Sequence, residues 1–112
     1  MRGWYKAAPG AEGVLAFLDE HVLLYDGLPC TKHVTTNLVV DVDEDEQTAT
    51  ASSYVTVFQA LPDFPLQPIL LGRYKDRFER VDGVWRWRAR QVIGDLRGDT
   101  SRHTRTPRTE TA

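Results

Sequence analysis

The 112-residue sequence contains one cysteine and one methionine, and it has no long apolar run. The single cysteine, Cys30, excludes an intrachain disulfide framework and a zinc site made of several cysteines. The longest apolar run near the N-terminus, Val14 to Leu18, is too short to cross a bilayer, and no signal peptide is visible. We therefore expect a cytoplasmic protein without a membrane partner.

An excess of charge of one sign is also missing. The chain has 14 lysines and arginines against 16 aspartates and glutamates, which gives a net charge of −2. A dedicated nucleic-acid module is strongly basic, so nucleic acid is not an expected partner. Hydrophobic residues make up 41% and charged residues 27% of a length that suits one small domain. This composition predicts a chain that folds around a single core.

The apolar spacing predicts one helix followed by strands. The first ten residues form an irregular segment or a short edge strand, and a helix spans 11–22 until Gly27 and Pro29 end it. Alternating patterns then predict strands at 31–42, 48–60, 69–81 and 84–95, in which Asp82–Gly83 is the strongest hairpin signal. The fold class is therefore α+β, with one helix and a curved four-stranded antiparallel sheet.

The end of the chain differs in composition from the rest. Residues 99–112 contain five threonines, three arginines and no large apolar side chain. A segment of this kind cannot bury enough apolar surface to fold by itself. We therefore predict one domain over residues 1–98 and a disordered C-terminal tail over residues 99–112.

His33 is the sharpest candidate for chemistry because it shares a strand face with Thr35 and Asn37 in a regular alternation. A histidine beside an amide on a half-buried strand is suited to act as a general base. The alternative is a structural histidine whose ring is satisfied by a backbone carbonyl. Pattern alone does not separate the two interpretations.

Asp76 is the second candidate, since it lies between Tyr74 and Phe78 on one face of the third long strand. A carboxylate desolvated between aromatic rings is suited to shuttle a proton or to bind an arginine. The alternative is a structural ion pair with an arginine such as Arg90.

The run from Trp85 to Arg90 alternates aromatic and basic residues. Stacking on single-stranded nucleic acid needs both kinds of side chain on one surface. A regular strand instead separates them into a Trp85, Trp87 and Ala89 face and an Arg86, Arg88 and Arg90 face. We therefore expect the tryptophans in the core and the arginines in solvent or paired with acids.

Taken in order, the strand sequences resemble the SnoaL-like branch of the nuclear-transport-factor-2-like superfamily, which includes scytalone-dehydratase-like enzymes, polyketide cyclases and small subunits of ring-hydroxylating dioxygenases. The residues that carry the resemblance are TKHVTTNLVV at 31–40, TATASSY at 48–54, GRYKDRF at 72–78 and DGVWRW at 82–87, preceded by GAEGVLAFL at 10–18.

The resemblance implies a cone in which a curved sheet encloses an apolar pocket. His33 matches the acid–base histidine of the dehydratase-like members and, with Asp76, would form the catalytic pair. The resemblance and the strand pattern together give the substrate-binding set Asn37, Tyr54, Phe58, Tyr74 and Arg90, with Gly72 also at a pocket-lining position.

The departures from the family pattern concern two features. The dehydratases place a second histidine on the next strand, where this chain has Phe58 and Gln59. They also use a tyrosine and an aspartate from an N-terminal helical hairpin, which this chain lacks. We expect Met1 to be an internal or misassigned start, or the gene to be truncated. Otherwise the concave face is expected to be exposed or covered by a partner chain.

These observations leave two hypotheses about function. The first is a small-molecule pocket protein of SnoaL-like type, acting as a dehydratase, isomerase or cyclase on a polyketide, aromatic or steroid-like substrate without metal or cofactor. As an enzyme it would be a cofactor-independent lyase or isomerase. The second is a non-catalytic ligand-binding or dimerisation domain, with the outer sheet face forming a homodimer. In both cases the expected ligand is a small hydrophobic organic molecule.

Overall fold

The computed structural model describes residues 2–4 and 10–105, with only the backbone described at 2–4, 10, 11 and 13. One helix and a single antiparallel sheet, in the spatial order β1-β5-β4-β3-β2, make up the fold. The predicted α+β class is confirmed, and a short N-terminal edge strand joins the sheet. The elements are β1 (Arg2–Trp4), α1 (Gly10–His21), β2 (Thr31–Asp43), β3 (Thr48–Leu61), β4 (Phe64–Val81) and β5 (Val84–Arg97).

Two Asp-Gly turns shape the chain. The turn that joins β4 to β5 has φ values of 52° at Asp82 and 77° at Gly83. A tight hairpin turn needs positive φ at both central residues, and this dipeptide adopts it readily. Asp26 and Gly27 repeat the conformation with φ values of 52° and 80°, and two backbone hydrogen bonds between Tyr25 and Leu28 close the turn. The second turn redirects the chain from α1 towards β2.

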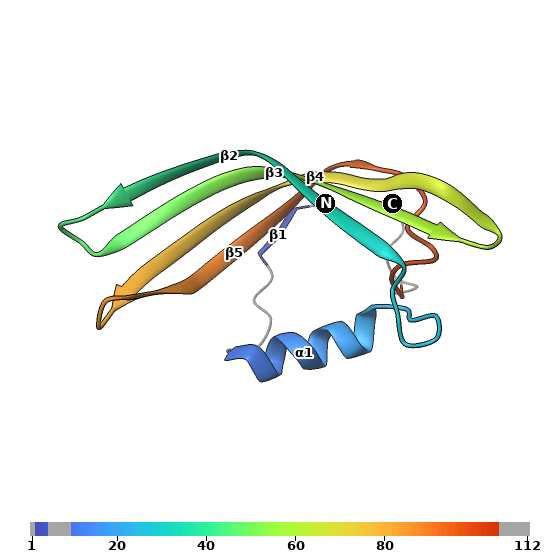
Figure 1. Ribbon diagram of the computed structural model, residues 1–112, viewed down its shortest axis with the longest axis horizontal. Coiled ribbons are helices and arrows are strands. Elements are labelled where there is room, and N and C mark those ends of the chain that lie inside the picture. The colour runs from blue at the N-terminus through green and yellow to red at the C-terminus, as the bar shows by residue number, and fades with distance from the viewer. Residues whose placement is uncertain (1, 5–9, 106–112) are drawn as a thin grey trace.

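The sheet arches over α1, so it has an inner face towards the helix and an outer face away from it (Figure 1). Side chains of β3 alternate strictly between these faces, and those on the inner face are buried. Val55 and Val57 lie on the inner face and form the core with Phe64 and Ile69. The inner residues of β3 are Ala49, Ala51, Ser53, Val55, Val57 and Gln59, and the outer ones are Thr50, Ser52, Tyr54, Thr56 and Phe58.

Two of the register shifts in the sheet change which candidate-site side chains share a face. In β2 the register shifts between Thr36 and Val39, so Val40 lies opposite Ala51 on the inner face. The predicted alternation placed Val40 away from His33, and beyond Asn37 that prediction is wrong because it assumed a regular strand. A bulge inserts one unpaired residue and so reverses the alternation that follows it.

The second bulge lies in β5. Trp87 pairs with Phe78 and Ala89 pairs with Arg77, so Arg88 is the extra residue. Arg90 then pairs with Asp76 and joins Trp87 on the inner face. The predicted separation of the tryptophan face from the arginine face is therefore wrong at Arg90.

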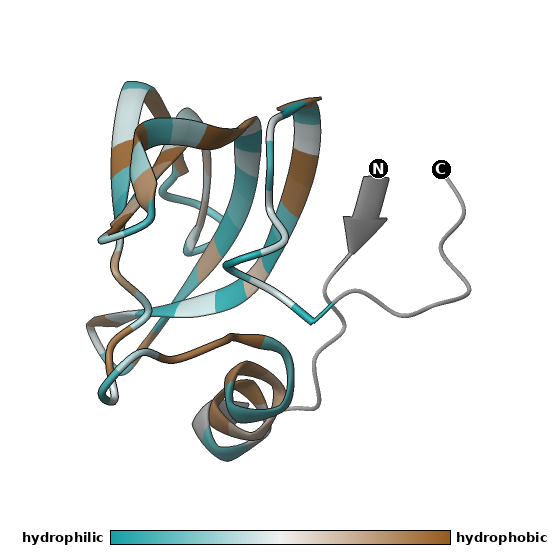
Figure 2. Cartoon of the chain, turned by 90° about the vertical axis from the view of Figure 1, so that its right-hand side faces the viewer, coloured by the Kyte–Doolittle hydropathy of each residue, from teal (hydrophilic) through white to brown (hydrophobic). Residues whose placement is uncertain are grey.

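Helix α1 leaves much of its apolar surface exposed. Val14 and Leu18 are each 45% exposed and Leu15 is 61% exposed, whereas Phe17 is partly buried and stacks on His21 at 4.2 Å between ring centroids. Figure 2 shows the apolar residues of the helix beneath the arch of the sheet. No helix in the described part of the chain is long and apolar enough to cross a membrane.

Residues Asp99–Arg105 form a C-terminal strap that ties α1 to the sheet. The Leu23 amide donates to the His103 carbonyl, and the Arg105 amide donates to the His21 carbonyl. Arg102 binds Asp63 through two hydrogen bonds of 3.0 and 3.1 Å. The predicted disordered tail therefore needs correction over 99–105, and its remainder, 106–112, lies outside the described residues. Backbone groups of the strap and the Arg102 side chain make these bonds, which composition does not reveal.

Candidate functional site on the inner face

Asp76 and Arg90 form the centre of the candidate site. Arg90 Nε donates to Asp76 Oδ1 at 2.8 Å and Arg90 Nη2 donates to Asp76 Oδ2 at 3.2 Å. Asp76 is only 5% exposed, while the Arg90 side chain is 40% exposed. The structure thus shows the ion pair that the sequence left as an alternative. With both oxygens engaged, the carboxylate is placed to hold the guanidinium rather than to meet a ligand.

Aromatic rings enclose the guanidinium of Arg90. Its Cζ lies 3.8 Å from the centroid of the Tyr74 ring and 4.5 Å from that of the Trp87 ring. The Trp87 ring in turn contacts the Phe78 ring at 4.5 Å between centroids. A cation between ring faces is held in place by the negative π surfaces. Tyr74 and Arg90, two predicted substrate-binding residues, are therefore brought together with Asp76.

His33 lies on the inner face of β2, opposite Val57, and much of its ring is exposed. Its partial burial and then the positive charge of Arg90 lower the pKa of His33 below its ordinary value. Both causes disfavour the imidazolium, so the neutral imidazole predominates at neutral pH and is able to accept a proton. The positive charge of Arg90 therefore acts on His33 although two strands, β3 and β4, lie between β5 and β2.

Three other predicted residues lie elsewhere. Tyr54 and Phe58 occupy outer positions of β3, and Tyr54 is 53% exposed, so neither shares a surface with Tyr74 and Asp76. Asn37 lies in the bulge of β2 with a φ of 54°. Asparagine tolerates this left-handed conformation well, so a backbone role explains its presence there. Their proposed substrate contacts stay predictions.

Gly72 lies on the inner face, where β4 and β5 approach closely. A Cβ atom at this position would overlap the carbonyl oxygen of Ile93. Backbone packing therefore requires a glycine at position 72. The same packing explains why Gly72 lies beside the predicted pocket-lining residues.

His103 belongs to the site, although the sequence analysis placed it in a disordered tail. Its ring centroid lies 6.4 Å from that of His33, with 66° between the ring planes. Burial and then the charge of His33 lower the pKa of His103. No periodic pattern surrounds His103, so only the path of the strap reveals its position. Trp87 was likewise expected in the core, yet it is 59% exposed on the inner face.

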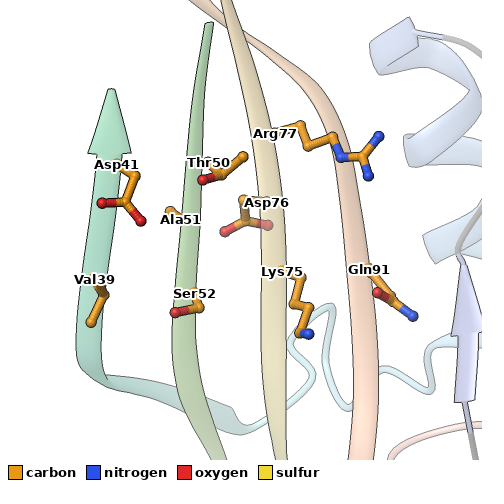
Figure 3. A pocket seen from close by; sticks show the side chains of 9 residues that line it. All are labelled: Val39, Asp41, Thr50, Ala51, Ser52, Lys75, Asp76, Arg77 and Gln91. Carbon is orange, nitrogen blue, oxygen red and sulfur yellow. The ribbon is translucent and has the colours of Figure 1, made fainter. Parts of the chain in front are cut away.

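A polar hollow of about 390 Å³ lies among side chains of the outer face and also touches Ala51 and Asp76, whose side chains belong to the inner face. Figure 3 shows that its side chains come from four neighbouring strands. Lysine and arginine lie on one side of it and an aspartate on the other. Within the described ranges no three His, Cys, Asp or Glu side chains are grouped so that they could hold a metal ion. The hollow is lined by Val39, Asp41, Thr50, Ala51, Ser52, Lys75, Asp76, Arg77 and Gln91.

Comparison with known proteins identifies the class to which this fold belongs. Residues 2–91 match the SnoaL-like domain family, which lies in the nuclear-transport-factor-2-like superfamily. The match spans most of the sequence, and the chain belongs to this family. No curated protein matches the chain.

One solved structure is similar to this chain: a substituted form of Rv3472, a function unknown protein from Mycobacterium tuberculosis. The two share 32% sequence identity with a TM-score of 0.51, over 58% of this chain and 37% of that one. This chain therefore matches little more than a third of the length of that relative. The likeness supports the fold, and the printed description of Rv3472 assigns no activity.

Proposed function

We propose that the inner face binds a small, largely apolar organic molecule and that His33 exchanges a proton with it. The observation that carries this proposal is the Asp76–Arg90 pair, in which the guanidinium of Arg90 contacts the Tyr74 and Trp87 rings and its positive charge acts on His33. Arg90 supplies a fixed positive charge, and the rings supply an apolar surface. An aromatic molecule with a carbonyl or carboxylate oxygen suits this combination.

In this proposal each side chain has a separate task. The oxygen of the guest lies near the guanidinium of Arg90, which Asp76 holds in place. Neutral His33 takes a proton from the carbon next to the carbonyl, and the electron pair of the broken C–H bond moves to the oxygen. Arg90 stabilises the negative charge that develops there. Returning the proton to a different carbon gives an isomerase. In a dehydratase the enolate instead expels a hydroxyl from the neighbouring carbon, and that hydroxyl takes the proton from His33 and leaves as water.

Binding is tested with 2-naphthoate, an aromatic carboxylate, by the quenching of tryptophan fluorescence. The Arg90→Gln variant should bind about tenfold more weakly, because it loses a charge-assisted hydrogen bond. Arg73→Gln is the matched control, since Arg73 forms an equivalent two-bond pair with Asp95 on the outer face. Equal losses in the two variants would reject the inner face as the binding surface.

Proton transfer is tested with 2-tetralone, an aromatic ketone, by following deuterium exchange at the carbon next to the carbonyl. Wild-type protein should accelerate the exchange, and His33→Ala should reduce it to the rate in buffer. If His33→Ala exchanges as fast as wild type, His33 is not the base. If wild type binds 2-naphthoate without catalysing exchange, the protein is a ligand-binding domain rather than an enzyme.

A second candidate function is self-association through the outer face. The hollow there presents Lys75 and Arg77 beside Asp41, so two copies related by a twofold axis could match opposite charges. Light scattering after size-exclusion chromatography should then show a dimer, and Lys75→Glu should shift it towards monomer. A monomer at high protein concentration would contradict this candidate.

A further inference from the structure

Three polar side chains meet where the C-terminal strap crosses the inner face. His33 comes from β2 and Gln59 from β3, and they share this face because Thr31 pairs with Gln59 while His33 pairs with Val57. Gln59 Nε2 donates to the carbonyls of Arg102 at 3.1 Å and Pro29 at 3.3 Å. The bond from Gln59 to the Arg102 carbonyl fixes the strap. The ring of His103, the next residue, therefore lies beside the ring of His33.

Two buried polar atoms of this group have no hydrogen-bond partner within the described part of the chain. One is the side-chain oxygen of Gln59, a residue that is only 1% exposed, and the other is Nδ1 of His103. Buried polar atoms are nearly always paired, so two unpaired ones on the residues that anchor the strap point to a role other than stability alone.

The protonation of each histidine ring depends on the charged groups around it, including the other ring. From β5, Arg90 acts on His33, and from the strap, His103 faces it. The charged residues of the strap are already engaged: Asp99 with Ser101, Arg102 with Asp63, and Arg105 with the Glu20 carbonyl. At the end of β5, Arg97 donates to the hydroxyl of Thr100. None of the ion pairs in the described ranges includes either imidazole.

We propose that His33 and His103 form an acid–base pair that holds one proton at a time, with His103 as the positioning partner of His33. The proposal rests on the proposed function, in which His33 receives a proton from the guest. Once His33 carries that proton, His103 stays neutral, and its ring lies beside the cation. The proton then returns to the guest from His33, so the pair ends in the state in which it began.

The test is an NMR titration of the histidine ring protons in the full chain. In His33→Gln, the pKa of His103 should rise by about half a pH unit or more, the effect of removing a unit charge at this distance in a water-like medium. In His33→Arg, which keeps a positive charge at every pH, the pKa of His103 should stay at its wild-type value. A rise in one variant and none in the other distinguishes charge coupling from a change in burial, because both substitutions alter the packing.

The variants are compared with the wild-type chain in the same spectra. If the pKa of His103 is the same in all three proteins, the pair does not exist. Failure of the 2-naphthoate and 2-tetralone experiments with intact coupling would instead reject the proposed function alone.

Discussion

Asp76 of β4 holds Arg90 of β5 through both of its carboxylate oxygens, and the two residues pair directly across the strands. The buried partner is the aspartate, whereas the arginine reaches into solvent. The carboxylate therefore fixes the direction in which the exposed positive charge points. Four predictions follow from this pair and from its surroundings, and a fifth from the bulge beside it.

The first prediction concerns the stability that the pair contributes. Asp76→Asn should lower the free energy of unfolding by about 1–3 kcal/mol, because it leaves Arg90 without its charged partner in a partly desolvated place. Urea denaturation measures this loss. The Asp95→Asn variant breaks the exposed Arg73 pair and should cost less, since solvent screens that pair. Equal losses would show that burial of Asp76 has no energetic consequence.

The second prediction concerns the close approach of β4 and β5. Gly72→Ala places a methyl group against the Ile93 carbonyl, which belongs to the backbone and cannot rotate away. The variant should lose about 1–3 kcal/mol or more of stability, or fail to accumulate as folded protein. Thermal unfolding provides the measurement. A variant as stable as wild type would mean that the two strands can separate at this point.

The third prediction concerns pH. The pKa values of His33 and His103 are lowered in the folded chain, so the unfolded chain binds more protons near their ordinary pKa. The stability that depends on these neutral rings is complete above about pH 7 and is lost as the pH falls towards about 5. The melting temperature should fall over that interval.

The double variant His33→Gln with His103→Gln provides the control for this pH effect, and its melting temperature should vary less over the same interval. Asp63 and Asp99 do not contribute to the change in melting temperature over this pH interval. Hydrogen bonds from Arg102 and Ser101 lower the pKa values of these carboxyls, so they lose their contribution only below about pH 4. A double variant with the wild-type pH dependence would exclude the histidines as its cause.

The fourth prediction concerns the attachment of the C-terminal strap. Gln59→Leu removes the side-chain donor that binds the Arg102 and Pro29 carbonyls, at a cost of about 1–3 kcal/mol for the carbonyls left unpaired. The Leu23 amide, which donates to His103, should then exchange with deuterium faster. The Arg80 amide, bonded to Gln47 near the far end of the sheet, should keep its rate.

Gln67→Leu is the matched control for the strap experiment. Its side chain also donates to a proline carbonyl, that of Pro65, but within an exposed part of one strand. It should change neither amide. Unchanged exchange at Leu23 in Gln59→Leu would show that Gln59 does not hold the strap.

The sequence predicts local features of this fold well because they depend on neighbouring residues. The Asp82–Gly83 turn is confirmed, since it follows from backbone preferences, and β3 spans almost the same residues as the predicted strand. The helix is also where its spacing predicts, although much of its apolar surface meets solvent.

The candidate site is harder to predict because it depends on register. One unpaired residue in β5 moves Arg90 to the face of Trp87, and strict alternation gives the opposite answer. Tyr54 was assigned to the pocket from the family resemblance, yet it lies on the outer position between two buried residues. His103 approaches His33 through hydrogen bonds made by the backbone of the strap, which leave no mark on the composition.

The extra residue in β5 also determines which insertions and deletions the chain can tolerate. Because Arg88 has no cross-strand partner, deleting it should produce an unbroken ladder in which Trp87 and Arg90 keep their orientation. Deleting Gln91 instead would shift the following residues by one position and turn their side chains over. Loss of one codon should therefore be nearly harmless at position 88 and damaging three codons later, which soluble expression of the two deletion variants would reveal.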